Sequence, residues 1–328
     1  MPESTHYDAV IVGGGPAGLS AALILGRCRR RVIVCDAGQQ RNRWSRHMHG
    51  YLTRDGIPPA EFLQLARRDL EPYDVKLCDN VVQAIRRDDD RFVVDLDSGL
   101  SITGRKVLLA TGVRDRLPAF PGVQELYGSS VHHCPYCDGW ENRDRAVAVY
   151  SKGGRGFGLA ISLKTWTDDV VLLTDGPARF SSSERQQLEH AGVPIRRERV
   201  AGVDGEDGRL RQIRFVSGEP LARHAMFFST PQDQSCELAR SMGCEFSKKG
   251  AVQTSLLQET CVPGVYVAGD ASRDVQLVIV AAAEGAKAGF AINTALQGRE
   301  KGPRANPDRR EKVPASESAP VADDAQEK

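Results

Sequence analysis

A glycine-rich turn between a short buried strand and a helix constrains this chain more than any other feature. Residues 9–12 read Ala-Val-Ile-Val, a composition typical of a buried strand, and Gly13-x-Gly15-x-x-Gly18 follows directly. The first glycine permits a tight turn, the second lets a pyrophosphate approach the backbone, and the third lets the helix pack closely on the strand. Asp36 ends the next strand, where an acid can accept a hydrogen bond from a ribose hydroxyl. The sequence therefore predicts a dinucleotide-binding unit near the N-terminus.

A second strand–glycine–helix–strand unit spans residues 146–175, with its helix expected over 159–166. Between the two units, residues 75–110 alternate apolar and polar side chains, as a small meander of strands does. This alternation of strands and helices predicts an α/β fold with two Rossmann-like nucleotide-binding units on parallel sheets.

Composition and charge exclude several classes of protein. The chain has 328 residues with 44 Lys or Arg and 43 Asp or Glu, so its net charge of +1 lacks the basic excess of a nucleic-acid-binding protein. The longest purely apolar run, residues 277–283, is too short to span a membrane. The first residues lack the basic region of a secretory signal. We therefore expect a cytoplasmic protein that binds neither nucleic acid nor membranes and has no disulfide framework.

Two cysteines three residues apart are the most informative candidates for chemistry. Cys134 and Cys137 are preceded by His132 and His133 and followed by Asp138. Cysteines at this spacing can close and reopen a disulfide, and a depressed pKa often makes one of them a ready thiolate nucleophile. A neighbouring imidazole or carboxylate can move the protons.

Two other interpretations of the pair stay open. A zinc site would need two more ligands, for which His47 and His49 are available. The cysteines can also be two buried structural thiols, although polar neighbours argue against an apolar setting. The remaining six cysteines occur singly, and we assign them no chemistry.

Together these features resemble the low-molecular-weight thioredoxin reductase family of FAD-dependent pyridine nucleotide-disulfide oxidoreductases. The resemblance covers about residues 6–298 and rests on four motifs in matching order, namely Gly13-Gly14-Gly15-Pro16-Ala17-Gly18, Ala110-Thr111-Gly112, Cys134-Pro135-Tyr136-Cys137-Asp138 and Gly264-Val265-Tyr266-Val267-Ala268-Gly269-Asp270. It implies two nucleotide-binding domains of three layers (ββα). One holds FAD, and the other, inserted into it, carries the cysteine pair and in typical members binds NADPH. Typical members are homodimers.

The resemblance also implies where the domains begin and end. The FAD-binding domain is expected over residues 1–116 and 248–300, and the inserted domain over residues 117–247. Residues 301–328 contain no aromatic residue and are rich in proline and charge, so we expect a disordered tail.

Functional roles are implied at matching positions. Cys137 is expected to react with the flavin, Cys134 to exchange with the substrate, and Asp138, assisted by His133, to donate and accept protons. No metal site is implied. The expected cofactor-binding residues are Gly13, Gly15, Pro16, Ala17, Gly18, Asp36, Asn42, Val82, Ala110, Thr111, Gly112, Gly269, Asp270, Gln276 and Leu277.

The second glycine loop departs from the family pattern. Where typical members have Gly-x-Gly-x-x-Ala, residues 151–156 read Ser-Lys-Gly-Gly-Arg-Gly. The arginines that usually hold the NADPH 2′-phosphate are replaced by Thr174-Asp175-Gly176, and an acidic side chain repels a phosphate. We therefore expect weakened NADP(H) binding, and Asp175 suits the free ribose hydroxyl of NADH better.

These departures resemble a branch of the family that closes disulfides in natural-product dithiols of the gliotoxin, holomycin and romidepsin type. They predict an FAD-dependent thiol–disulfide oxidoreductase that oxidises a small-molecule dithiol and passes electrons through FAD to O2 or NADP⁺. Asp138 departs from some members of that branch, which carry His there. The alternatives are a thioredoxin reductase acting on a thioredoxin-like protein, and a non-catalytic protein that binds FAD structurally.

Overall fold

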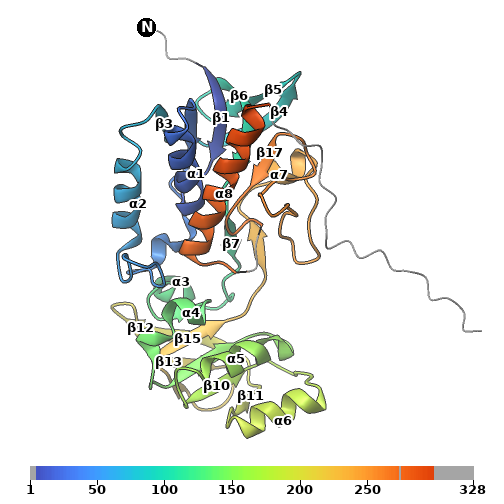
Figure 1. Cartoon of the computed structure of the whole chain (residues 1–328). Coiled ribbons are helices and arrows are strands. Elements are labelled where there is room, and N and C mark those ends of the chain that lie inside the picture. The colour runs from blue at the N-terminus through green and yellow to red at the C-terminus, as the bar shows by residue number, and fades with distance from the viewer. Residues whose placement is uncertain (1–4, 273–274, 299–328) are drawn as a thin grey trace, which may run out of the picture.

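The chain folds into two lobes, each built around its own β-sheet (Figure 1). The structure is a computed structural model and describes residues 5–272 and 275–298. Among those residues, no helix is long and apolar enough to cross a membrane. The expected tail, residues 301–328, lies outside the described residues. The predicted α/β fold with two Rossmann-like units is confirmed.

The first lobe contains a seven-stranded sheet in the order β3-β2-β1-β6-β5-β4, with β17 also paired to β6. Strands β3, β2, β1, β6 and β17 run parallel, whereas β4 and β5 form an antiparallel meander with β6. The bounds are β1 His6–Val12, β2 Val32–Cys35, β3 Val75–Cys78, β4 Val82–Asp88, β5 Arg91–Leu96, β6 Ser101–Leu109 and β17 Val265–Val267.

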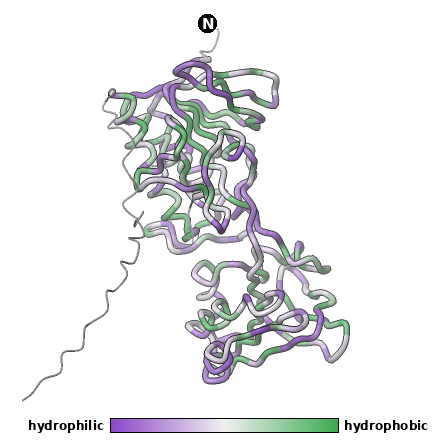
Figure 2. Tube along the Cα trace, turned by 90° about the vertical axis from the view of Figure 1, so that its right-hand side faces the viewer, coloured by the Kyte–Doolittle hydropathy of each residue, from purple (hydrophilic) through white to green (hydrophobic). Residues whose placement is uncertain are grey.

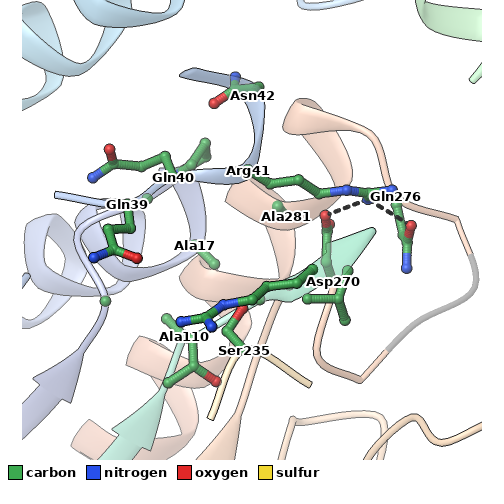
Figure 3. Close-up of a pocket in the computed structure, with 18 of the residues that line it drawn as sticks. Ala17, Gln39, Gln40, Arg41, Asn42, Ala110, Ser235, Asp270, Gln276 and Ala281 are labelled. Carbon is green, nitrogen blue, oxygen red and sulfur yellow. Dashed lines mark hydrogen bonds and ion pairs between the residues drawn. The ribbon is translucent and has the colours of Figure 1, made fainter. Parts of the chain in front are cut away.

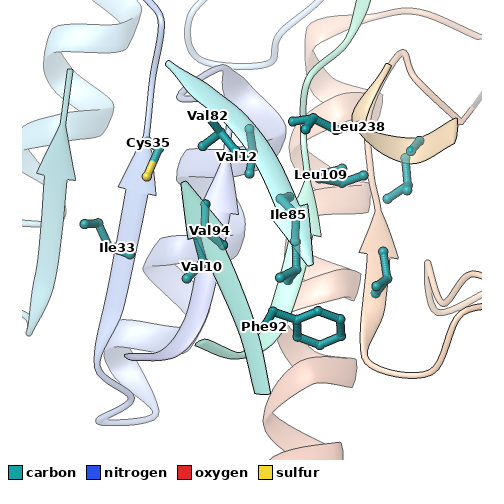
Figure 4. Close-up of a cluster of buried hydrophobic side chains, with 14 of the residues drawn as sticks. Val10, Val12, Ile33, Cys35, Val82, Ile85, Phe92, Val94, Leu109 and Leu238 are labelled. Atoms are coloured by element: carbon teal, nitrogen blue, oxygen red, sulfur yellow. The ribbon is translucent and has the colours of Figure 1, made fainter. Parts of the chain in front are cut away.

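Alternating side chains of β1 enter two separate buried clusters, which explains why this apolar run forms a central strand. Val10 packs with Val94 and Phe92 of the meander (Figure 4). Ile11 packs on the opposite face, against the helices. The parallel strands therefore lie between a layer of strands and a layer of helices. The helices of this lobe are α1 Pro16–Arg27, α2 Pro59–Arg68, α7 Leu238–Ser241 and α8 Val278–Leu296, with the 3₁₀ turn η1 Arg41–Trp44.

The second lobe contains a five-stranded parallel sheet in the order β11-β10-β9-β15-β8. A three-stranded antiparallel sheet, β12-β13-β14, packs on it through a shared apolar cluster. The strands are β8 Val131–His132, β9 Val147–Tyr150, β10 Val170–Leu173, β11 Ile195–Arg196, β12 Val200–Glu206, β13 Arg209–Phe215, β14 Leu221–Ala222 and β15 Ala225–Phe228. The helices and 3₁₀ turns are α3 Val123–Leu126, α4 Pro135–Asp138, η2 Trp140–Asn142, η3 Gly153–Gly156, α5 Phe157–Leu163 and α6 Ser182–His190.

Two short antiparallel strands carry the chain between the lobes. They are β7 Val113–Asp115 and β16 Gln232–Gln234, and Figure 2 shows the narrow connection that they form. After β16, Leu238 and Cys244 already pack in the core of the first sheet. The chain thus returns to the first lobe earlier than the boundary at residue 247 that the sequence predicts, because these apolar side chains find their partners there.

Candidate functional site

The first glycine loop forms the tight turn that the sequence predicts. Gly13 has a φ of +108°, and its N–H donates to the Cys35 carbonyl oxygen at 2.8 Å. Helix α1 begins at Pro16, so the N–H groups of its first turn, which lack partners inside the helix, lie at the loop. A Cβ at Gly15 would meet no atom within 4 Å, whereas one at Gly18 would overlap the Gly13 carbonyl oxygen. Gly15 therefore borders open space, and Gly18 serves the packing of α1 on β1.

One cavity brings together nearly all residues that the sequence assigns to cofactor binding (Figure 3). Those that line it are Gly13, Gly15, Pro16, Ala17, Asp36, Asn42, Val82, Ala110, Thr111, Gly112, Gly269, Asp270, Gln276 and Leu277. Gly18 does not line it. Helix α8 begins at Val278, and Leu277 is the extended residue before its first turn.

Asp36, at the end of β2, is held in a fixed orientation at this cavity. Its side chain is buried and accepts hydrogen bonds from Gln40 at 2.9 Å and from Arg67 of α2 at 2.8 Å. The Gly38 N–H donates to its other oxygen at 3.2 Å. A carboxylate has about four acceptor sites, so this one can still accept a hydroxyl of a ligand.

Arg41 lies at the centre of a buried charge cluster beside the cavity (Figure 3). Its guanidinium donates to both oxygens of Asp115 at 2.6 and 2.7 Å, to Asp270 at 3.0 Å and to Gln276 at 2.6 Å. Burial raises the pKa of Asp115, but the hydrogen bonds of Arg41 and the charges of His133 and Arg41 outweigh it, and the pKa falls to about 2. Burial raises the pKa of Asp270 despite its ion pair with Arg41.

Arg41 and Asp115 are site residues that the sequence motifs do not indicate. Arg41 lies in the polar connection after β2, and Asp115 follows the Ala110-Thr111-Gly112 motif in β7. Neither residue belongs to a periodic pattern. The only available signal was their proximity in sequence to Asn42 and Gly112, two expected cofactor-binding residues.

Cys137 lies in the single helical turn α4, and Cys134 is the extended residue directly before that turn. Cys134 and Cys137 form a disulfide with their Cα atoms 5.3 Å apart. Cys137 lines the cavity of the glycine loop, whereas Cys134 lines a second cavity. The disulfide therefore connects two cavities that approach it from different sides.

The two expected proton carriers next to the disulfide have different partners. Asp138 lies 3.2 Å from Nδ1 of His132, and both line the first cavity. His133, which the sequence analysis paired with Asp138, lies instead beside Tyr127, at 3.5 Å from Nδ1 to Oη, and beside Asp115 at 3.9 Å. Burial is the main cause that lowers the pKa of His133 to about 4, so its imidazole is neutral at neutral pH.

The second cavity has a volume of about 580 Å³, in the range of small-molecule sites. Aromatic and aliphatic side chains form much of its wall, and both lobes contribute to it. The residues that line it are Asp115, His133, Cys134, Tyr136, Leu159, Phe228, Ser229, Thr230, Gln232, Val275, Gln276 and Leu277.

The second glycine loop differs in geometry from the first. It folds as the 3₁₀ turn η3, and the Gly153 N–H donates to the Thr174 carbonyl oxygen at 2.9 Å. The Asp175 carboxylate accepts from the Tyr150 hydroxyl at 3.1 Å and from the first backbone N–H of β12 at 2.9 Å. Both carboxylate oxygens of Asp175 thus have a partner within the second lobe.

Residues 7–285 match the family model described as pyridine nucleotide-disulphide oxidoreductase. The chain belongs to this family. It is 33% identical over 314 residues to a Claviceps purpurea protein named thioredoxin reductase tcpT, covering 90% of this chain and 96% of that protein. It is 32% identical over 302 residues to a probable thioredoxin reductase of Arthroderma benhamiae, covering 82% and 75%. The predicted resemblance to thioredoxin reductases is confirmed.

Solved structures of similar proteins share the fold of this disulphide oxidoreductase. The crystal structure of HlmI is 34% identical in sequence and superposes with a TM-score of 0.86 over 91% of this chain and 95% of that chain. A putative thioredoxin reductase TrxB from Bacillus anthracis is 31% identical and superposes with a TM-score of 0.84 over 89% and 99%.

Disulphide oxidoreductases of this kind use FAD, with NADP(H) as the usual partner cofactor. The first cavity fits FAD, because it combines a glycine loop with open space at Gly15, a helix N-terminus and an oriented acid at Asp36. The second loop is covered on one side, since a Cβ at Gly154 would overlap the Arg179 carbonyl oxygen, whereas a Cβ at Gly153 would meet no atom within 4 Å. Among residues 5–272 and 275–298, no group of three or more His, Cys, Asp or Glu side chains is arranged to hold a metal ion.

Proposed function

We propose that this disulphide oxidoreductase oxidises a small-molecule dithiol to a disulfide, with FAD as the acceptor of the electrons. The observation that supports this most directly is the position of the Cys134–Cys137 disulfide between two cavities. A substrate thiol in the second cavity meets Cys134, while Cys137 borders the cavity that fits FAD. Thiol–disulfide exchange at Cys134 therefore delivers an electron pair to Cys137, on the side of the cofactor.

The second cavity favours a small molecule over a protein disulfide. Leu159 and Phe228 come from the second lobe and Gln276 from the first, so Cys134 lies between walls of both lobes. A volume of about 580 Å³ accommodates a compact molecule with two thiols.

The second glycine loop supports the oxidising direction. Its Gly153 N–H, which would face a pyrophosphate, is bonded to Thr174, and the chain at Arg179 covers Gly154. A site that binds NADPH poorly cannot feed electrons into the flavin efficiently. We therefore propose molecular oxygen as the acceptor of the electrons that reach FAD.

Bound FAD supplies a two-electron acceptor next to Cys137. We assign the pyrophosphate of FAD to the first glycine loop and the N-terminus of α1, its adenosine ribose to Asp36, and its ribityl chain to Asp270. Cys134 forms the mixed disulfide with the substrate, and Cys137 leaves as a thiolate. Asp138, 3.2 Å from His132, holds or releases a proton on this side.

Thioredoxin reduction is the second candidate function, because the similar proteins from Claviceps purpurea and Arthroderma benhamiae carry that name. It requires NADPH or another donor to reduce the flavin. The two candidates therefore differ in what bleaches the flavin absorbance.

Anaerobic flavin spectroscopy on the purified protein tests the proposal. We expect dithiothreitol to bleach the flavin, air to restore it, and NADPH to leave it oxidised. Cys137→Ser is expected to retain FAD and to lose turnover by about a thousandfold or more, because the disulfide can no longer form. Bleaching by NADPH at a rate that supports turnover would favour the reductase, and full activity of Cys137→Ser would refute the mechanism.

We further propose that each lobe is a nucleotide-binding-type domain and that the inserted domain splits the FAD domain at β7 and β16. We also propose that the enzyme is a cytoplasmic homodimer. The domain division is supported by the separate cores of the two sheets. Homodimers are typical of the family that the sequence resembles. The molecular mass in solution, measured by light scattering, tests the dimer, since a mass near 36 kDa would contradict it.

A further inference from the structure

Three linked side chains, two of which line the second cavity, have no role in the reaction steps of the proposed function. The Tyr127 hydroxyl donates to Oδ2 of Asp115 at 2.7 Å, and Nδ1 of His133 lies 3.5 Å from the same hydroxyl. Asp115 and His133 line the second cavity together with Cys134. An acid that orients an imidazole beside a reactive sulfur or oxygen is a recurring way to activate a nucleophile.

We propose that His133 is the base that accepts the proton of the incoming substrate thiol, and that Asp115 and Tyr127 are positioning residues that orient its ring. This inference rests on the proposed dithiol oxidation. His133 lines both cavities, whereas Asp138 and His132 line only the first. Of these three residues, His133 is therefore the one that a substrate in the second cavity can reach.

The surroundings of His133 keep its ring unprotonated at neutral pH, which is the state that can accept a proton. The titratable or charged groups that face it are Arg41, Asp115, Tyr127, His132 and Asp138. Burial and then the charge of Arg41 lower the pKa of His133 to about 4, so the ring is unprotonated at pH 7. Asp115 stays ionised, because its pKa is about 2. When Nδ1 carries its proton toward Tyr127 and Asp115, the lone pair of Nε2 is free to accept another.

Asp115 is rigid enough to orient the ring. Besides the Tyr127 hydroxyl, it accepts two hydrogen bonds from Arg41 and one from Nε2 of Gln232 at 2.8 Å. The side chain of His133 is 28% exposed, so a proton taken up there can leave to solvent through the cavity.

The first step consumes the enzyme disulfide and needs no other oxidant. One substrate thiol transfers its proton to Nε2 of His133, and its sulfur forms a bond to Cys134. The Cys134–Cys137 bond breaks, and Cys137 keeps the electron pair as a thiolate. The second substrate sulfur then bonds to the first, its proton passes to the departing Cys134 sulfur, and the proton on His133 leaves to solvent. The dithiol has lost two electrons, and the enzyme has gained them.

The test follows opening of the disulfide directly, without relying on the flavin signal. FAD-loaded protein is mixed anaerobically with dithiothreitol, quenched in acid and alkylated, and the mass of the peptide with Cys134 and Cys137 gives the fraction opened. His133→Gln should slow opening about a hundredfold at pH 7. The deficit should shrink to within about threefold at pH 9.5, because a thiol with an ordinary pKa near 8.5 is then ionised in solution. His190→Gln, on the exposed end of α6, is the matched control and should open like the wild type.

Tyr127→Phe keeps the ring that packs near Phe228 but removes the hydroxyl, so it tests the positioning role in a variant expected to fold. It should slow opening about tenfold at pH 7, with the same recovery at high pH. A wild-type rate in His133→Gln at pH 7, or an equal deficit at both pH values, would overturn the inference while leaving dithiol oxidation intact. A wild-type disulfide that dithiothreitol does not open would instead refute the proposed function, and with it this inference.

Discussion

Arg41→Gln is expected to destabilise the junction of the two lobes, because it removes the cation shared by the buried carboxylate of Asp115 and the partly buried carboxylate of Asp270. Arg41 belongs to the first lobe, Asp115 lies on β7, and Asp270 follows β17. The side chain of Asp115 is only 4% exposed, so water cannot readily replace the guanidinium. The variant therefore leaves uncompensated charge in the interior.

The size of the effect follows from the pKa of Asp115. A folded pKa of about 2 against an ordinary 3.8 corresponds to about 2 kcal/mol at 1.36 kcal/mol per pH unit. Because the folded pKa is the lower one, this stabilisation is present above pH 4 and is lost as the pH falls through 2. Removing one partner of a buried pair typically costs about 3–5 kcal/mol. We expect the free energy of unfolding to fall by about 3 kcal/mol at pH 7.

The free energy of unfolding of Arg41→Gln should rise as the pH falls from 7 to 5, which is opposite to the direction that the Asp115–Arg41 pair gives the wild type. Without Arg41, burial raises the pKa of both Asp115 and Asp270, so protonation at pH 5 relieves part of the cost. Urea unfolding, followed by tryptophan fluorescence at a fixed saturating FAD concentration, measures the free energy of unfolding at pH 5 and at pH 7. Arg43→Gln in the same 3₁₀ turn is the control. The exposed Arg43 donates to backbone carbonyls and lies over the Trp44 ring but, among the described residues, forms no ion pair with a carboxylate, so its loss should cost less than about 1 kcal/mol. A loss below about 1 kcal/mol in Arg41→Gln, or an equal loss at pH 5 and pH 7, would refute the reasoning.

Two glycine substitutions test the cavity and the contact between the lobes. Gly15→Ala adds a Cβ to the open space of the cavity and should lower FAD affinity at least about tenfold in a fluorescence titration, while the unfolding of the FAD-free protein stays unchanged. Gly158→Ala, whose added Cβ also meets no atom, is the control and should bind FAD normally. Unchanged FAD binding by both variants would contradict the assignment of the cavity to FAD. Gly128→Ala should lower the free energy of unfolding by about 1–3 kcal/mol more than Gly250→Ala does. Both glycines have a positive φ, but only Gly128 packs against the Trp44 backbone. Equal losses in urea unfolding would show that this contact does not stabilise the protein.

The sequence was sufficient to predict the features that depend on local pattern. The strand before Gly13, the turn and the start of α1 form one continuous segment, so composition and spacing specify them together. The cysteine pair is also local, and the predicted disulfide chemistry agrees with the bond between Cys134 and Cys137. Family resemblance then implied the role of Asp270, whose place after a buried strand indicates a polar turn but not its function.

The remaining site residues depend on contacts between distant segments. Arg41 and Asp115 meet across the junction of the lobes, and nothing near either residue encodes the other. Which histidine lies beside Asp138 also depends on packing between distant segments. Adjacent residues at the end of a strand point to opposite sides, so His132 and His133 had to diverge, but only the packing of β8 on β15 decides which one faces Asp138.

The disulfide between the two cavities has a consequence for how such an enzyme diversifies. The molecule that donates electrons and the cofactor that accepts them occupy separate chambers and never need to touch. Substitutions at Leu159, Phe228 or Val275 can reshape the donor chamber while the glycine loop and Asp36 remain as they are. Substrate selectivity can therefore change from one sulfur compound to another without substitutions at the disulfide or at the residues assigned to the cofactor.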